Sequence, residues 1–339
     1  MTDAHVFKII IILALAPILA LLPPRYVEAL PSGFTYEMVT FPLAGTNGSS
    51  STVLYDINNT GDISGVATNS NGTLGFISSG VAGFATAITF PDTHFFSLND
   101  LGQSVGLSAS AIPDYNGGFF RDTDGSFHPV TVAGGLAATP FGISNSGLIV
   151  GEYRDSTGHH GFIQHIDGTG FLSIGASDEF VRLRSVNDQG VIVGVSVRNG
   201  VANGFLLGID GIRLEVAFPG ASQTALMDIN NAGVITGEFF GPNGAGDLSD
   251  RHGFIRDAIG NYLQFDVPGA LETAPLGIND SGVVVGVFNN AINGYGFVAT
   301  PCSTGESNCS SVSVPEPSTL LLLGSGLVGL AAWRRKQSA

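Results

Sequence analysis

Short apolar runs separated by turn-forming residues recur along most of this chain. In six places an apolar residue precedes Asn or Ser, a polar residue, any residue, Gly, and another Gly four positions later. The six stretches are INNTGDISG (57–65), LNDLGQSVG (98–106), ISNSGLIVG (143–151), VNDQGVIVG (186–194), INNAGVITG (229–237) and INDSGVVVG (278–286). Asn, Asp and Gly favour tight turns, because the short polar side chains bond the local backbone and Gly accepts a positive φ. The Val, Ile and Leu residues on either side are typical of strands, so each stretch predicts a hairpin.

A Gly–Phe pair follows each of these hairpins as a second landmark. The pairs begin at Gly75, Gly118, Gly161, Gly204, Gly253 and Gly296. A further turn and an apolar strand come after them, so the unit reads as four short strands. Successive units begin 41, 45, 43, 43 and 49 residues apart. A period of about 40–45 residues with four strands is typical of a β-propeller blade.

The two ends of the array predict how it closes. The sixth unit stops near Pro301 without a fourth strand, whereas residues 36–45 (YEMVTFPLAG) resemble the fourth strand of the fifth unit, residues 262–271 (YLQFDVPGAL). A first strand that completes the last blade removes the free edge of the ring. We therefore expect an all-β, six-bladed β-propeller over residues 34–301, closed by residues 36–41 pairing beside residues 296–300.

Both landmarks carry a packing prediction. The last glycine of each motif is expected at an equivalent strand position, and the six phenylalanines are expected to be buried between adjacent blades. The glycines are Gly65, Gly106, Gly151, Gly194, Gly237 and Gly286, and the phenylalanines are Phe76, Phe119, Phe162, Phe205, Phe254 and Phe297.

The repeats resemble the HAF family of bacterial probable extracellular repeats, whose units carry the same apolar-Asn-x-x-Gly core followed by Gly-Phe. The resemblance covers residues 36–301. It implies an exported bacterial protein, and it leaves the activity open because the family is defined by its repeat.

The N-terminal segment has the pattern of a secretory signal peptide. Lys8 precedes an apolar run, and small residues then end at Ala29. We predict a signal helix over residues 1–29 that is cleaved near Ala29. A first transmembrane helix is the alternative, although three prolines interrupt the run.

The C-terminal segment predicts a second contact with the membrane. Residues 318–333 are apolar throughout, and as a helix they would extend about 24 Å, at ~1.5 Å per residue. That is a short transmembrane helix for a hydrocarbon core of about 30 Å. The basic residues Arg334, Arg335 and Lys336 follow it and would stay in the cytoplasm, which leaves the propeller outside.

The same segment, VPEPSTLLLLGSGLVGLAAWRRK, resembles the PEP-CTERM sorting signal in its Pro315, Glu316 and Pro317, its apolar helix and its basic end. The resemblance implies an envelope or matrix protein that is processed by a membrane-embedded peptidase called exosortase, often in organisms that make exopolysaccharide. Residues 315–339 would then be an address outside the fold, joined to it by a linker over residues 302–314. A plain membrane anchor is the alternative interpretation.

Charge narrows the choice of partner. Residues 30–316 hold 26 acidic side chains and 8 arginines, a net charge of −18, and no lysine lies between Lys8 and Lys336. A chain this acidic repels nucleic acid and anionic lipid headgroups, so neither is expected as a partner. Calcium, carbohydrate hydroxyls or a basic partner fit better. We expect no cofactor.

Several smaller motifs favour structural interpretations. Cys302 and Cys309 enclose STGESN and are predicted to pair in an oxidising compartment, with free thiols as the alternative. The GSGLVG sequence at residues 324–329 lies inside the apolar tail, without the preceding strand that a nucleotide-binding loop needs.

Two acidic or histidine pairs lack the partners of a metal site. Asp122 and Asp124 in RDTDGSF lack the other ligands of a calcium loop and are interpreted as a turn. His159 and His160 are expected in a solvated loop, because zinc would need further ligands at matching spacings. No metal site is predicted.

The candidate binding residues lie where the repeat is broken. The fifth unit carries an insertion, GPNGAGDLSDRHG, in which Asp247, Asp250, Arg251 and His252 gather. The favoured hypothesis is a non-enzymatic envelope or matrix protein whose propeller binds exopolysaccharide or an envelope protein, with no catalytic residues.

Two alternatives remain open at this point. One is a glycan-cleaving enzyme, for which Asp247, Asp250 and the pair Asp178 and Glu179 supply candidate carboxylates; paired carboxylates about 5 Å or 6.5–9.5 Å apart carry out glycoside hydrolysis. The other is a structural spacer in a surface layer.

Overall fold

The computed structural model describes one all-β body. The described residues are 33–41, 51–80, 87–112, 115–132, 136–176, 178–241, 251–290, 294–302 and 310–311. The predicted signal peptide with Ala29, the sorting signal with Pro315 to Pro317 and the basic Arg334, Arg335 and Lys336 lie outside them. Within the described part of the chain, no helix is long and apolar enough to cross a membrane.

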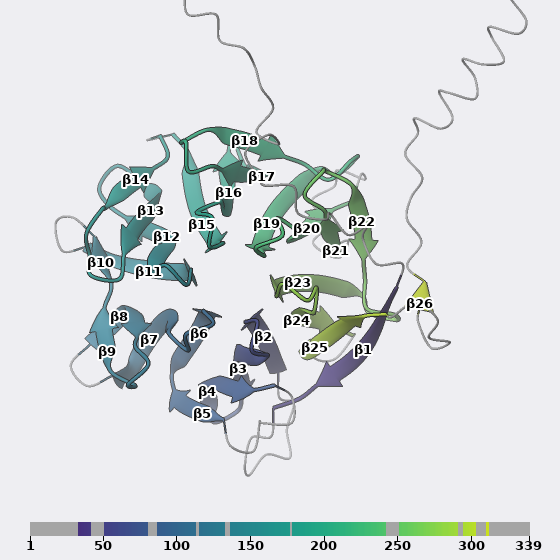
Figure 1. Cartoon of the computed structure of the whole chain (residues 1–339), viewed down its shortest axis with the longest axis horizontal. Coiled ribbons are helices and arrows are strands. Elements are labelled where there is room, and N and C mark those ends of the chain that lie inside the picture. Colours follow the sequence, from purple (N-terminus) through teal and green to yellow (C-terminus); the bar gives the residue numbers. More distant parts are fainter. Residues whose placement is uncertain are drawn as a thin grey trace, which may run out of the picture.

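Six antiparallel sheets stand around a central axis, and Figure 1 shows them as the blades of a propeller with the first strand of each blade innermost. Blade 1 is β2 (Ser51–Ile57), β3 (Asp62–Asn69), β4 (Gly72–Ser79) and β5 (Ile88–Pro91), and blade 2 is β6 (Thr93–Leu98), β7 (Ser104–Ile112), β8 (Tyr115–Arg121) and β9 (Phe127–Pro129). Blade 3 is β11 (Leu136–Ile143), β12 (Leu148–Arg154), β13 (His159–His165) and β14 (Leu172–Ile174), with β10 (Thr131–Val132) beside β11. The six-bladed, all-β prediction is confirmed.

The second half of the chain repeats this plan. Blade 4 is β15 (Phe180–Val186), β16 (Ile192–Arg198), β17 (Val201–Leu207) and β18 (Arg213–Val216), and blade 5 is β19 (Gln223–Ile229), β20 (Ile235–Phe240), β21 (Arg251–Arg256) and β22 (Tyr262–Phe265). Blade 6 is β23 (Glu272–Ile278), β24 (Val284–Asn289), β25 (Gly294–Pro301), β1 (Gly33–Val39) and the short β26 (Ser310–Ser311).

The N-terminal strand closes the ring as predicted. β1 pairs antiparallel with β25, from Phe34 opposite Pro301 to Val39 opposite Gly296. β26 then pairs with the start of β1, so both ends of the described chain lie side by side at the rim of blade 6 (Figure 1). The first and last blades therefore pack against each other, and the ring is closed.

The motif glycine and the phenylalanine of each unit form a cross-strand pair. Gly65 faces Phe76, Gly106 faces Phe119, Gly151 faces Phe162, Gly194 faces Phe205, Gly237 faces Phe254 and Gly286 faces Phe297. All six phenylalanine side chains are fully buried. Their rings lie over the glycine backbone, where a Cβ atom would clash with them. Both packing predictions are confirmed.

The glycine before each phenylalanine lies on the opposite face of the blade and allows the next blade to pack closely against it. A Cβ at Gly161 would stand 2.9 Å from Leu183 of blade 4, and one at Gly204 would stand 2.9 Å from Leu226 of blade 5. At Gly296 the neighbour is Leu54, 3.0 Å away across the junction between the last blade and the first. The Gly-Phe dipeptide therefore fixes how closely successive blades approach.

Two local expectations meet different outcomes. His159 and His160 belong to strand β13, so the prediction of a solvated loop was wrong. His160 is buried, and its Nε2 atom lies 2.8 Å from Thr157 Oγ1 and 3.2 Å from Asp155 Oδ1. The alternation of the strand hides this histidine inside blade 3. Cys302 is disulfide-bonded, while Cys309, the partner we predict, lies outside the described residues.

Candidate functional site: the central channel

A β-bulge near the end of every innermost strand shapes the channel. Its register shifts fall between Leu54 and Asp56, Phe95 and Ser97, Pro140 and Gly142, Leu183 and Ser185, Leu226 and Asp228, and Pro275 and Gly277. A bulge inserts one unpaired residue and re-aims the side chains next to it. The extra residues are Tyr55, Phe96, Phe141, Arg184, Met227 and Leu276, and all six line one cavity. In each blade, one residue separates this non-repeated residue from the start of the repeated motif.

The first polar residue of each motif caps its own turn and ties one blade to the next. Asn58 Oδ1 accepts hydrogen bonds from the backbone N–H groups of Thr60 and Asp62, while Asn58 Nδ2 donates to the Asn99 carbonyl of blade 2 at 3.0 Å. The same interblade bond starts from Asn99, Asn187, Asn230 and Asn279. At the third blade the residue is Ser144, which has no amide to donate.

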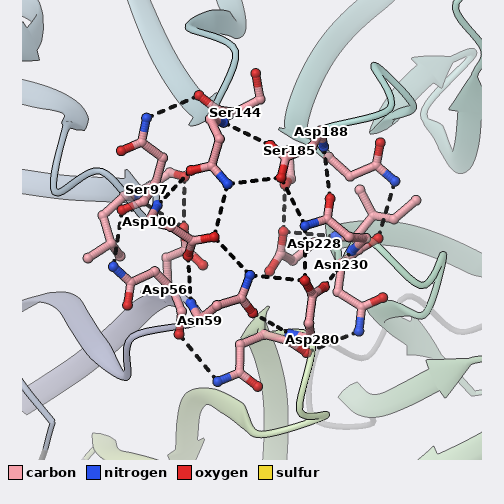
Figure 2. Close-up of a pocket in the computed structure, with 18 of the residues that line it drawn as sticks. Asp56, Asn59, Ser97, Asp100, Ser144, Ser185, Asp188, Asp228, Asn230 and Asp280 are labelled. Atoms are coloured by element: carbon pink, nitrogen blue, oxygen red, sulfur yellow. Dashed lines mark hydrogen bonds between the residues drawn. The ribbon is translucent and has the colours of Figure 1, made fainter.

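The second polar residues form a closed ring at one mouth of the channel, which we call the clasp. Its members alternate between amide and carboxylate in chain order: Asn59, Asp100, Asn145, Asp188, Asn231 and Asp280. Every Asn Nδ2 donates to the Oδ2 atoms of both flanking aspartates, at 2.9–3.0 Å. Every backbone N–H of the ring donates to the Oδ1 atom of the next member, at 2.7–2.9 Å. Figure 2 shows these bonds running around the axis.

The alternation has a chemical reason. An amide NH₂ carries two donors and a carboxylate accepts only, so a ring of this kind closes without a mismatch when the two types alternate. Alternation in turn requires an even number of blades. Burial acts to raise the pKa of Asp100, but hydrogen bonds from Asn145 and Asn59 outweigh it and hold that pKa below its ordinary value. The side-chain amide protons of the clasp all donate within it, so the clasp serves to hold the six blades together.

Two further aspartates lie one layer deeper in the channel. Asp56 accepts hydrogen bonds from Ser97 Oγ at 2.7 Å, Leu98 N at 3.1 Å and Ile57 N at 2.8 Å. Burial, and then repulsion from Asp228, raise the pKa of Asp56 to about 8. Figure 2 shows Asp56 and Asp228 on opposite sides of the channel.

Asp228 has a matching set of donors drawn from three blades. It accepts from Ser185 Oγ of blade 4, from Ile229 N of its own blade at 2.8 Å, and from Ile278 N of blade 6 at 2.6 Å. Burial raises its pKa as well. Because their donors come from neighbouring blades, both aspartates connect blades through the channel wall.

A cavity of about 170 Å³ lies beyond these aspartates, on the side away from the clasp. Five of its ten lining residues are apolar or aromatic, and the other five are polar or charged, with Arg184 as the one cation among them. The Arg184 guanidinium lies 5.2 Å from the centre of the Phe141 ring. Burial, and then the nearby Arg182, lower the pKa of Arg184 to about 10.

Ion pairs surround Arg184 without including it. Arg182, two residues earlier on β15, forms a two-pronged pair with Glu152 at 2.8 Å for each bond. Arg251 pairs with Glu238 at 3.5 Å and with Glu272 at 3.3 Å. Burial raises the pKa of Glu238, although Arg251 and Arg184 act against that shift.

The predicted insertion site is described only in part. Asp247 and Asp250 lie outside the described residues. Arg251 is held by the two glutamates just named, and His252 Nδ1 lies 2.9 Å from Asp266 Oδ2 with its ring stacked on Phe239. Arg251 therefore contributes to the ion pairs near the channel, while His252 packs within blade 5.

The other candidate carboxylates serve local structure. Partial burial acts to raise the pKa of Glu179, but hydrogen bonds from Arg213 and Ser196 outweigh it and hold the pKa low. Arg213 Nη2 lies 2.9 Å from Glu179 Oε1, whereas Asp178 is mostly exposed. Asp122 and Asp124 accept backbone N–H groups of their own turn, as expected. The described residues hold no cluster of three or more ligands suited to a metal ion.

Sequence reasoning missed the channel residues, although a signal for them existed. The two positions before each motif read Tyr-Asp, Phe-Ser, Phe-Gly, Arg-Ser, Met-Asp and Leu-Gly. These are the variable residues that stand beside the most regular ones. Variation at that place marks the layer that faces the axis.

Comparisons with known proteins agree with this architecture. The family model of the PEP-CTERM protein-sorting motif matches residues 313–336. No curated protein matches the sequence. Among solved structures, TolB from Acinetobacter baumannii is similar over 76% of this chain and 65% of its own, with 14% identity and a TM-score of 0.52. This chain therefore spans less than two thirds of TolB.

Virginiamycin B lyase from Staphylococcus aureus is similar over 78% of this chain and 99% of its own, with 11% identity and a TM-score of 0.44. These likenesses concern the propeller fold alone. The sorting motif, in contrast, implies an exported protein that passes through exosortase-type processing at the membrane and reaches the cell surface.

Proposed function

We propose that this protein is an exported bacterial envelope or extracellular-matrix protein whose propeller is a binding module. The observation that supports this proposal most strongly is the PEP-CTERM motif at residues 313–336, which follows the closed ring in the sequence. The resemblance of its repeats to the HAF family supports the same compartment. After export the chain is held in the inner membrane through residues 318–333, and processing by an exosortase-type enzyme then releases it to the surface or the matrix.

The arrangement of the channel supports a binding role at the end opposite the clasp. At the clasp, the amide donors are already bonded within the ring, so a ligand would have to compete with those bonds. At the cavity around Arg184, apolar walls and a few polar groups occur together, which is the usual composition of a ligand pocket. Partners in the envelope are an exopolysaccharide or another envelope protein.

Binding is favoured over glycan cleavage because of how the carboxylates are held. A glycoside hydrolase needs two carboxyl groups free to act on the substrate, one of them as a proton donor. Asp56 and Asp228 have raised pKa values, which favours the enzymatic alternative, but each already accepts three hydrogen bonds from the channel wall. Their bonds to neighbouring blades support a structural role.

One experiment separates these functions. The full chain, purified in non-ionic detergent, is incubated with exopolysaccharide and envelope fractions from the native bacterium. We expect the chain to sediment with one of these fractions without releasing new reducing ends. Release of reducing ends that is lost in Asp56→Asn or Asp228→Asn would establish the enzyme instead, and absence of both binding and release would leave the module without its proposed role.

A further inference from the structure

We propose that the cavity around Arg184 binds a single carboxylate group carried by a small apolar or aromatic body. This inference rests on the binding role proposed for the cavity and names the class of ligand; it does not depend on the sorting signal. Arg184 provides the recognition, and the bulged residues around it provide the walls.

Arg184 is a partly buried cation that lines the cavity, and its hydrogen-bonding capacity is unused within the described part of the chain. It makes no hydrogen bond or ion pair with any of the residues that the structure describes, and its Nε atom is enclosed without a partner. A charge that has given up part of its hydration gains from a partner of opposite charge. An anionic ligand would supply the partner that the fold does not.

The nearby carboxylates are engaged elsewhere. Glu152 is held by both prongs of Arg182, and Glu238 is paired with Arg251. They lie near enough to act on the charge of Arg184, yet neither is bonded to it. The two ion pairs leave the guanidinium of Arg184 as the uncommitted cation of this layer.

Arginine is suited to a carboxylate in particular. Its planar guanidinium presents parallel N–H donors that match the two oxygens of one carboxylate. The Arg184 guanidinium carbon lies 5.2 Å from the centre of the Phe141 ring, a cation–π contact that this ring also makes with Arg182. A monoatomic anion would use only part of this geometry.

The residues that line the cavity determine the size and polarity of the group that can accompany the carboxylate. Phe96, Phe141, Met227 and Leu276 present apolar or aromatic surface to the cavity. A volume of about 170 Å³ lies below the ~300 Å³ of ordinary drug-sized pockets. The site therefore suits a carboxylate on a ring or a short chain.

The acidic groups at the far end of the cavity do not oppose this ligand strongly. Asp56 has a pKa raised to about 8, so it is largely neutral at pH 7. Asp228 lines the cavity as well; burial raises its pKa too, and three donors of the channel wall occupy its oxygens. Salt screens the exposed carboxylates beyond about 8 Å. A polyanion would still meet the net charge of −18, so a single carboxylate is the favoured ligand.

Isothermal titration of the full chain in non-ionic detergent tests the site with three probes: benzoate, benzamide and acetate. Benzoate carries both the charge and the ring, benzamide has the ring without the charge, and acetate has the charge without the ring. We expect benzoate to bind at least tenfold more tightly than either of the others. Equal binding of benzoate and benzamide, or no binding of benzoate, would overturn the proposal.

Variants assign the binding to Arg184. Arg184→Gln is expected to weaken benzoate binding at least tenfold, and Arg184→Lys to fall between it and the wild type because the charge remains without the fork. Arg198→Gln is the matched control, since Arg198 is half exposed and pairs with Asp178 and Glu179 away from the channel. An equal loss in the control would mean general charge attraction and would overturn the assignment. If Arg184→Gln does not fold, the comparison of benzoate with benzamide in the wild type still decides.

Discussion

Gly194 on β16 lies directly opposite Phe205 on β17, and the Phe205 ring fills the space that a side chain at position 194 would need. The same pair occurs in all six blades. The glycine that ends each motif is therefore required by the phenylalanine that comes later in the unit.

Replacing Gly194 by Ala tests this relationship. The new Cβ would stand 2.5 Å from the Arg182 carbonyl oxygen and 2.9 Å from Phe205 Cζ. We expect the free energy of unfolding to fall by about 1–3 kcal/mol, the usual cost of overpacking. Gly208→Ala is the control, because its nearest neighbour is the end of the exposed Asp210 side chain, which can move away at the cost of one hydrogen bond from Ile212 N. Equal melting temperatures for the two variants would contradict the packing account.

Removing the ring tests the same pair from the other side. Phe205 is fully buried, so Phe205→Ala should lower the free energy of unfolding by about 3 kcal/mol or more. Ile209→Ala removes a side chain that is 86% exposed and should change it little. Denaturant unfolding of both variants measures the difference, and an unchanged midpoint for Phe205→Ala would refute the burial claim.

The clasp allows a test of alternation itself. Asp188→Asn alone places an amide between two amides, Asn145 and Asn231, and should cost about 1–3 kcal/mol through unmatched donors. Exchanging Asn and Asp at all six clasp positions restores the alternation with every residue changed. We expect this sixfold variant to be more stable in thermal unfolding than Asp188→Asn. A sixfold variant that is less stable would show that the identity at each position matters more than the order.

The sequence was sufficient for the blades because their periodicity is local. Turn residues, β-branched runs and the Gly-Phe pair each report on neighbours within one unit. The closure of the ring was predicted because the last unit lacks a fourth strand and the chain begins with an additional one. The Asn and Asp turns were also interpreted correctly as turns. Their second role, the clasp, joins residues 41–49 positions apart and, where the ring closes, Asn59 with Asp280, 221 positions apart. No local pattern shows that these residues meet.

The channel residues escaped prediction for a different reason. Arg184 faces the axis because a bulge at that position breaks the alternation of β15, and alternation is what sequence reasoning uses to assign a side chain to a face. The break in the repeat instead placed the predicted binding site at the insertion with Asp247 and Asp250. His160 is predicted in a loop although it pairs with Tyr153 and bonds Thr157 and Asp155, because a polar His-His pair before a glycine lacks the apolar alternation of a strand.

Asp56 gives the protein a defined pH dependence. Its pKa is raised to about 8 by burial and by Asp228, whereas an unfolded aspartate titrates near ~3.9. Between these values the folded state binds the extra proton, so the free energy of unfolding should fall as the pH rises from about 5 to 8. Asp56→Asn removes this titration and should fall less steeply over that range.

Thermal unfolding of both proteins at several pH values measures the two slopes. Burial lowers the pKa of His94, which acts in the opposite direction in both proteins, so the difference between the slopes reports Asp56 together with its interaction with Asp228. Parallel slopes for the wild type and Asp56→Asn would contradict a raised pKa at this site.

Carboxy-terminal mass spectrometry of the mature protein from its native bacterium tests the central claim most directly. Processing as a PEP-CTERM protein predicts a terminus that lacks the residues from about Leu320 to Ala339. A variant with alanine at Pro315, Glu316 and Pro317 should be exported and folded but keep its C-terminal segment, because the apolar helix and basic end survive. A mature surface protein that still ends at Ala339 would contradict the account and would make the segment a plain membrane anchor.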